Sequence, residues 1–306
     1  MESTESQSRK ERIILSSSDN PQFEPPVRAE AQSPAPTLSA PDPSATASIP
    51  LVPAAPPPIE NPVWNGWDVL LIAGLTVVTM VVFQLGVLVA AHFLWYPQES
   101  LADLSKKPIV LIVSQCLIYI PVAACMVALV EGKYQVGFWR AIQWNWPRAE
   151  WRLLALGAAM FFVLGLLQNL LPMPQDTPFE HLFDRPRDAY LLSLIAVTLG
   201  PLMEELFFRG LMYPVLARRM GAAWGIALTA LPFGLIHLPQ YGWAWGAALV
   251  IFLVGVVCGA VRAVTRSVGA SFLVHAGFNG TQMLIAVVMT HGFRHMPKAL
   301  LQLSLL

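Results

Sequence analysis

The chain is dominated by apolar segments that are long enough to cross a lipid bilayer. A helix needs roughly 20 apolar residues to cross the hydrocarbon layer, and seven segments approach this length. They lie at about 67–95, 108–130, 152–171, 190–216, 220–238, 243–264 and 268–290. Because a spanning segment must satisfy its backbone hydrogen bonds internally, each is expected to be a helix. The sequence therefore predicts an all-α, polytopic transmembrane helix bundle of about seven spans.

The fifth segment, 220–238, is the shortest and contains Pro232, so six spans plus a re-entrant segment remain an alternative. The composition agrees with a membrane protein, because 55% of the residues are hydrophobic and only 12% are charged. The formal net charge is zero, which gives no reason to expect a nucleic-acid partner. The expected partners are the lipid bilayer and a membrane-embedded or lipidated protein or peptide.

The composition also divides the chain into parts. Residues 1–62 hold 13 of the 26 prolines, mixed with Ser and Ala, and are expected to form a disordered tail. Residues 63–150 hold two spans and an aromatic, basic segment at 132–151 that is expected to lie on the membrane surface. Residues 151–292 form the predicted core, and 293–306 form a C-terminal tail.

The charges in the loops predict the orientation. With the N-terminus inside, the cytoplasmic loops hold eight Lys or Arg and the opposite loops hold six. The N-terminal residues contain no apolar segment typical of a removable signal peptide, which favours the same orientation. We therefore expect a multi-pass protein of the bacterial cytoplasmic membrane with its N-terminus inside.

Two adjacent acidic residues interrupt the fourth apolar segment. Glu204 and Glu205 are the only acidic residues after Ala189, although seven Lys or Arg follow them. Ionisable side chains at membrane depth are energetically costly, so they indicate a functional site. Whatever negative charge this half of the molecule uses must come from this pair.

Helical geometry predicts different roles for the two glutamates. Glu205 and Arg209 are four residues apart with the acid first, which favours an ion pair along one helix face. Glu204 projects about 100° away from its neighbour and must face elsewhere. Glu204 is therefore the better candidate for a general base, although Arg209 is long enough to reach either carboxylate.

Further polar side chains lie on two other segments. Phe233 and His237 are four residues apart on the fifth, and His275 and Asn279 have the same spacing on the seventh. Residues at this spacing share a helix face. The carboxylate of Glu204 and an imidazole can activate water, while an amide and a second imidazole can stabilise an oxyanion. These groups favour hydrolysis of a peptide bond within the membrane.

Zinc binding is an alternative use of the same groups. Glu204, His237 and His275 would be the ligands, leaving a position for water. The compact HExxH arrangement is absent, so a mechanism without a required cofactor is favoured. Ser271 lies one turn from His275 and is expected to be a helix-stabilising hydroxyl.

Three motifs resemble those of a known protease family. EELFFR (Glu204 to Arg209), FGLIH (Phe233 to His237) and HAGFN (His275 to Asn279) match the pattern EExxxR, FxxxH and HxxxN of the CAAX protease and bacteriocin-processing (CPBP, or Abi) family. The resemblance covers roughly 150–290. It implies a CAAX-type intramembrane endopeptidase in which Glu204 and His237 activate water and His275 and Asn279 stabilise the oxyanion. The family has been described both as metalloproteases and as glutamate-type proteases.

Two functions without catalysis remain as alternatives. The charged cluster of a membrane scaffold or a bacteriocin self-immunity protein would only tie helices together. Intramembrane Glu and His residues also relay protons in transporters, but the sequence shows no duplicated motif of the kind that many transporters contain.

Overall fold

The computed structural model describes residues 60–173, 177–178, 180–183 and 185–295. Nearly all of the expected disordered tail and of the C-terminal tail lies outside these residues. Within the described part the regular elements are helices and no strand occurs, which confirms the all-α fold. The elements in chain order are α1 (Gly66–Leu94), α2 (Leu101–Leu104), α3 (Pro108–Val127), η1 (Ala128–Lys133), α4 (Phe138–Ala141), α5 (Glu150–Gln168), η2 (Glu180–Phe183), α6 (Pro186–Val197), α7 (Leu199–Glu205), η3 (Leu206–Met212), α8 (Tyr213–Met220), α9 (Ala222–Leu235), η4 (Leu238–Tyr241), α10 (Trp245–Thr265) and α11 (Val268–Met289).

Six helical stretches of the described chain are long and apolar enough to cross a membrane. They are α1, α3 with η1, α5, the continuous run from α6 to α8, α10 and α11. The number is close to the predicted seven, and the protein is an integral, multi-pass membrane protein. The difference lies at the fifth segment.

The helix at this fifth segment, α9, is only 14 residues long. At 1.5 Å per residue it extends about 21 Å, less than the roughly 30 Å of a bilayer's hydrocarbon core. The predicted span 220–238 is therefore wrong at its C-terminal end. The α-helix stops at Leu235, and His237 lies in the turn just before the short 3₁₀ helix η4, which contains Pro239.

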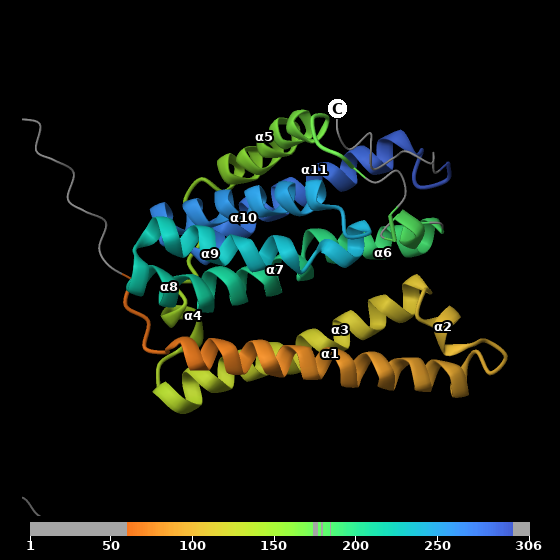
Figure 1. The fold of residues 1–306 in the computed structure, drawn as a ribbon, viewed down its shortest axis with the longest axis horizontal. Helices are drawn as coiled ribbons and strands as arrows, with labels where there is room; N and C mark the ends of the chain where they lie inside the picture. The colour runs from red at the N-terminus through yellow and green to blue at the C-terminus, as the bar shows by residue number, and fades with distance from the viewer. Residues whose placement is uncertain (1–59, 174–176, 179, 184, 296–306) are drawn as a thin grey trace, which may run out of the picture. The chain divides into compact units, whose positions relative to one another are not determined.

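Close helix packing positions the last span. α11 packs along α5 (Figure 1), and glycines at the contact let the two backbones approach. A Cβ at Gly277 would lie 2.5 Å from the carbonyl oxygen of Leu154, and one at Gly157 would lie 2.2 Å from that of Val274. Small residues at such contacts are typical of membrane helix pairs. α9 packs along α10, and α1 along α3 (Figure 1).

The fourth span departs from regular helix at two places. Thr198, with φ −117° and ψ −79°, separates α6 from α7. After Glu205 the chain continues as the π-helix η3, which holds Arg209. The buried indole of Trp64 donates a 2.8 Å hydrogen bond to the carbonyl of Leu211 in this π-helix. Irregular turns of this kind often mark functional sites.

The segment 132–151 contains the short helix α4. Phe138 of α4 is buried, and Trp144 lies against Phe272 of α11, with 5.9 Å between the ring centres. The segment thus packs on the core through its aromatic rings. Its predicted position at the membrane surface stays a prediction.

Candidate active site

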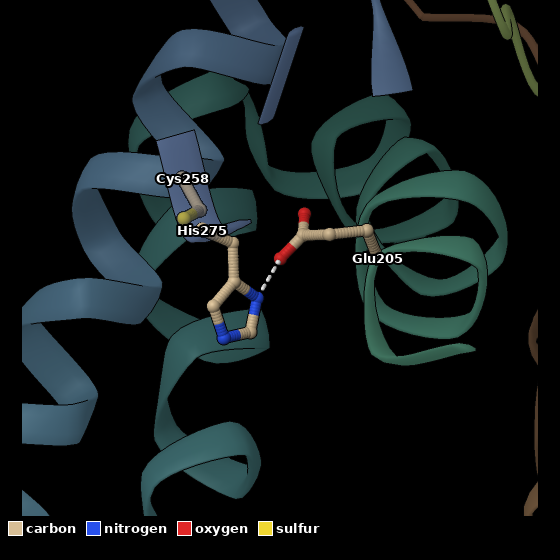
Figure 2. A group of neighbouring side chains, drawn as sticks. All are labelled: Glu205, Cys258 and His275. Atoms are coloured by element: carbon tan, nitrogen blue, oxygen red, sulfur yellow. Dashed lines mark hydrogen bonds and ion pairs between the residues drawn. The ribbon is translucent and has the colours of Figure 1, made fainter. Parts of the chain in front are cut away.

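The Glu205 carboxylate is the buried centre of the site. Its side chain has no solvent exposure. Oε1 lies 3.0 Å from Arg209 Nη1 and 3.0 Å from His275 Nδ1, and Oε2 accepts a 2.7 Å hydrogen bond from Ser271 Oγ. Figure 2 shows the carboxylate and the imidazole of His275 pointing toward one another. A guanidinium and two hydrogen-bond donors around one carboxylate favour its ionised form.

Arg209 pairs with Glu205, so the predicted ion pair is present. The guanidinium is buried; its Nη2 donates a 2.9 Å hydrogen bond to the carbonyl of Gly255 in α10. Its central carbon lies 4.5 Å from the centre of the Phe233 ring in α9, a cation–π distance. Arg209 therefore joins η3 to α9 and α10.

Glu204 faces a different direction from Glu205, as the helical geometry predicted. Its side chain is 26% exposed. Oε1 lies 3.8 Å from Nε2 of His237, and Oε2 lies 3.7 Å from Nε2 of His275. These separations exceed those of direct hydrogen bonds. A polar gap of this size between two acceptors suits a bridging water.

The contacts of Nδ1 determine which ring nitrogen carries the hydrogen in each of the two histidines. His237 Nδ1 lies 2.7 Å from the carbonyl oxygen of Phe233, which can only accept, so Nδ1 carries a hydrogen. His275 Nδ1 likewise donates to Glu205. When neutral, both imidazoles therefore direct the Nε2 lone pair toward Glu204.

The end of α9 explains the place of His237. The backbone N–H of His237 bonds to the carbonyl of Gly234 at 3.3 Å, which leaves the Phe233 carbonyl to the imidazole. The prolines at 232 and 239 flank this irregular turn.

Asn279 connects α11 to the break in the fourth span. Its Nδ2 donates a 2.7 Å hydrogen bond to the carbonyl of Ala196, two residues before Thr198. An amide carries two N–H donors, so one remains for another acceptor. Asn279 lines the same cavity as Glu204, His237 and His275.

Phe233 lies among the charged residues of the site. Its ring centre is 5.1 Å from that of His237 and 5.6 Å from that of His275, in addition to its contact with Arg209. The residues predicted from sequence are thus gathered in one place, from η3, α7, α9 and α11 and the turn before η4.

The site lies in a cavity of about 930 Å³. Apart from the residues above, its walls include Gln115 and Tyr119 of α3 and, from three connecting segments, Lys106, Pro178 and Gln240. Those segments join α1 to α3, α5 to α6 and α9 to α10, so they all lie at the end of the bundle where α1 finishes. The cavity therefore extends toward that end.

The phenol of Tyr241 also lines the cavity, outside the spans. Burial raises the pKa of Tyr241 to about 12, and the negative charges of Glu204 and Glu180 contribute to the rise. The phenol therefore keeps its proton at neutral pH and remains a hydrogen-bond donor.

A metal would have to use residues that meet closely. Among the described residues, Glu205, Cys258 and His275 have potential ligand atoms within 4.8 Å of one another. This is not the trio predicted for zinc, which contains Glu204 and His237 instead. Glu205 is already engaged by Arg209, whose positive charge would repel a cation, so these three residues do not fit a metal site.

Some residues of the site were not identified from sequence, or were given a smaller role. Ser271 bonds to the Val268 carbonyl at 3.0 Å, as expected of a helix-stabilising hydroxyl, but it also donates to Glu205. Its position four residues before His275 was the available signal, because both share one face of α11. Nothing in the sequence pattern placed Tyr119 or Cys258 near the motifs.

Comparison with known families matches the part of the chain that carries the motifs. Residues 186–281 match the model of a family described as type II CAAX prenyl endopeptidase Rce1-like. The matched segment contains all three motifs, and the resemblance inferred from them is thereby confirmed, over a narrower range than 150–290. A search of curated proteins and a search of solved structures each find no match. The hairpin of α1 and α3 lies outside the matched segment.

Proposed function

We propose that this chain, with its Rce1-like segment at 186–281, is an intramembrane endopeptidase that hydrolyses a peptide bond in a membrane-associated or lipidated protein. The family match supports a CAAX-type protease at the family level. The observation that carries the residue assignment is the position of the Glu204 carboxylate between the Nε2 atoms of His237 and His275. These groups meet in a cavity with mainly apolar walls, as a lipid-linked peptide requires.

Glu204 and His237 activate the water in this proposal. A water that donates one hydrogen to Glu204 Oε1 and the other to His237 Nε2 fits the 3.8 Å gap between them. The water oxygen adds to the carbonyl carbon of the substrate while Glu204 takes its proton. The carbonyl electron pair moves to oxygen, and the tetrahedral intermediate then loses the amine, which receives the proton as the C–N bond breaks.

His275 and Asn279 stabilise the oxyanion. Asn279 has a second N–H after bonding to Ala196, and a protonated His275 donates from Nε2. Glu205 orients the His275 ring by accepting the hydrogen of Nδ1. Arg209 and Ser271 in turn hold Glu205 in place.

We infer that the reaction needs no metal. Zinc, if bound, would be held by Glu204, His237 and His275 and would act as a Lewis acid on the substrate carbonyl. Against this, the trio whose ligand atoms do meet within 4.8 Å is a different one. Activity that persists in a chelator supports the metal-free reaction, and activity lost in chelator and restored by zinc contradicts it.

The test is cleavage of a farnesylated peptide that ends in Cys-aliphatic-aliphatic-X by the purified full chain in detergent. Glu204→Gln keeps the shape of the side chain but removes the base. We expect kcat to fall by at least about 10²-fold in this variant and in His237→Ala. Glu99→Gln is the matched control, because Glu99 pairs with Lys107 outside the cavity and its loss should leave kcat unchanged.

The result would decide between protease and scaffold. Full cleavage by Glu204→Gln and His237→Ala contradicts these two assignments. If the parent protein cleaves neither the farnesylated nor the unmodified peptide, the proposed activity on lipidated CAAX peptides is wrong. A membrane scaffold or an immunity protein then becomes the better account, with Glu204→Gln preserving that function.

A further inference from the structure

α3 contributes two polar side chains to the wall of the cavity. Gln115 and Tyr119 are four residues apart on this helix, so they share one face, and both line the cavity that contains Glu204. α3 lies outside the family-matched residues 186–281. These two polar side chains are therefore a feature of the site that the motifs do not include.

The position of the Tyr119 hydroxyl follows from its contact with α7. A Cβ at Gly200 would lie 3.8 Å from the Tyr119 oxygen, and Gly200 is one helical turn before Glu204. Residues four apart occupy the same face of a helix. The hydroxyl thus lies beside the face of α7 that carries Glu204, and both residues line the same cavity.

The hydrogen-bonding of Tyr119 leaves its proton available. Gln115 precedes Tyr119 by one helical turn, so its side-chain amide shares a helix face with the phenol. A phenol both accepts and donates, so a bond received from this amide would orient the ring hydroxyl without using its hydrogen. Among the described residues no acceptor is recorded for that hydrogen.

An oxyanion at this site needs donors that are not already committed. Asn279 uses one N–H on Ala196, and His275 uses its Nδ1 hydrogen on Glu205. Both of these residues lie on α11, so they reach a bound carbonyl from one side. A donor on α3 would reach the same oxygen from a different helix.

The geometry points to Tyr119 as a further catalytic residue, whose hydroxyl donates a hydrogen bond to the oxyanion formed from the scissile carbonyl. This inference rests on the proposed peptidase activity. Gln115 is then a positioning residue that orients the phenol. The hydroxyl keeps its proton throughout, so the proton balance of the reaction at Glu204 is unchanged.

Tyr119→Phe in the full-length protein tests the inference with the farnesylated peptide. It removes only the hydroxyl, and we expect kcat to fall by about 10²-fold, the usual effect of losing one oxyanion donor. KM should change by less than about threefold, because the bond strengthens in the transition state. Gln115→Ala should lower kcat less, since it misorients the donor without removing it.

Tyr190→Phe is the matched control. Tyr190 is half exposed, packs on Phe293 at 5.1 Å between ring centres and is not among the residues that line the cavity. The kcat of Tyr190→Phe should equal that of the parent protein. If Tyr119→Phe lowers the melting temperature, a second variant replaces Tyr119 by 3-fluorotyrosine. This residue keeps the ring and the hydroxyl but changes the strength of the hydroxyl as a hydrogen-bond donor. The kcat of this variant should change while its KM does not.

The outcomes separate this inference from the proposed function. An active parent whose kcat is unchanged in Tyr119→Phe, or in which only KM rises, overturns the role of Tyr119 and leaves the peptidase intact. An inactive parent overturns the proposed activity itself. A loss of kcat in Tyr119→Phe with the melting temperature kept supports the inference.

Discussion

Glu204 and Glu205 are neighbours in the chain, but their surroundings are opposite. The Glu205 side chain is fully buried among Arg209, His275 and Ser271, whereas 26% of the Glu204 side chain is exposed to the cavity. Removing one partner of a buried ion pair leaves an uncompensated charge, which costs much more than losing an exposed one. The two residues should therefore fail in different ways when they are changed.

Glu205→Gln should lose stability first. It leaves the Arg209 guanidinium buried without its counter-charge, which we expect to lower the free energy of unfolding by roughly 3–5 kcal/mol. Glu204→Gln should keep the stability of the parent protein while losing activity. Thermal unfolding in detergent, read alongside peptide cleavage, checks both. Equal melting temperatures for the two variants would contradict this division of roles.

For individual residues, the sequence predicted pairs within one helix and missed contacts between helices. The spacing of Glu205 and Arg209 was sufficient to predict their ion pair, because residues four apart on a helix are neighbours. It was not sufficient to show that His275 would contact Glu205 through Nδ1 and face Glu204 through Nε2. That arrangement depends on how α11 sits against α7, which no spacing within one segment determines.

The contact between α5 and α11 sets where His275 lies. Gly277 is two residues after His275, and a methyl group there would come within 2.5 Å of the Leu154 carbonyl. A Cβ this close to a backbone oxygen would require one of the two helices to shift. The position of α11, and with it the reach of His275 and Asn279, therefore depends on a glycine.

Gly277→Ala should push α11 away from α5. We expect it to cost roughly 1–3 kcal/mol of stability, the range found for overpacking, and to lower kcat. Gly280→Ala is the control on the same helix, since a Cβ there would meet only Val197, at an ordinary 3.6 Å. Thermal unfolding and peptide cleavage are measured for both variants. Equal melting temperatures and equal kcat values would show that α5 and α11 accommodate the added methyl group, and would contradict the prediction.

The irregular parts of the helices were the least predictable elements. The sequence predicted a single fourth span at 190–216, and the run Pro186–Met220 is one span, but its helix is irregular at Thr198 and in the π-helix η3. Hydrophobic length sets the existence of a span, whereas a local change of hydrogen-bonding pattern depends on partners such as Asn279 and Trp64 from other parts of the chain. The early end of α9 at Leu235 has the same origin, because the His237 side chain replaces a backbone donor.

In the molecule as a whole, the cavity extends toward the end of the bundle where α1 finishes. With the predicted orientation, N-terminus inside, that end faces away from the cytoplasm. Lys106 lines the cavity at this end, whereas Arg219 lies in the last turn of α8 at the other. The orientation predicted from loop charges thus determines on which side the substrate approaches.

Labelling with a membrane-impermeant thiol reagent tests this orientation. Lys106→Cys and Arg219→Cys are placed separately in a chain whose three native cysteines are replaced by Ala. Lys106→Cys should react in intact cells and Arg219→Cys only after permeabilisation, because the reagent does not cross the bilayer. The reverse pattern would place the cavity mouth on the cytoplasmic side and overturn the predicted orientation.

The residues that surround Glu204 come from distant parts of the chain, from Tyr119 in α3 to Asn279 in α11. Domains are made from the N-terminus onward, at about 5–20 residues per second. A partly synthesised chain that has inserted α1 to α10 already carries Glu204 and His237, but it lacks His275 and Asn279. The group of residues that lines the cavity is therefore incomplete until the last span enters the membrane.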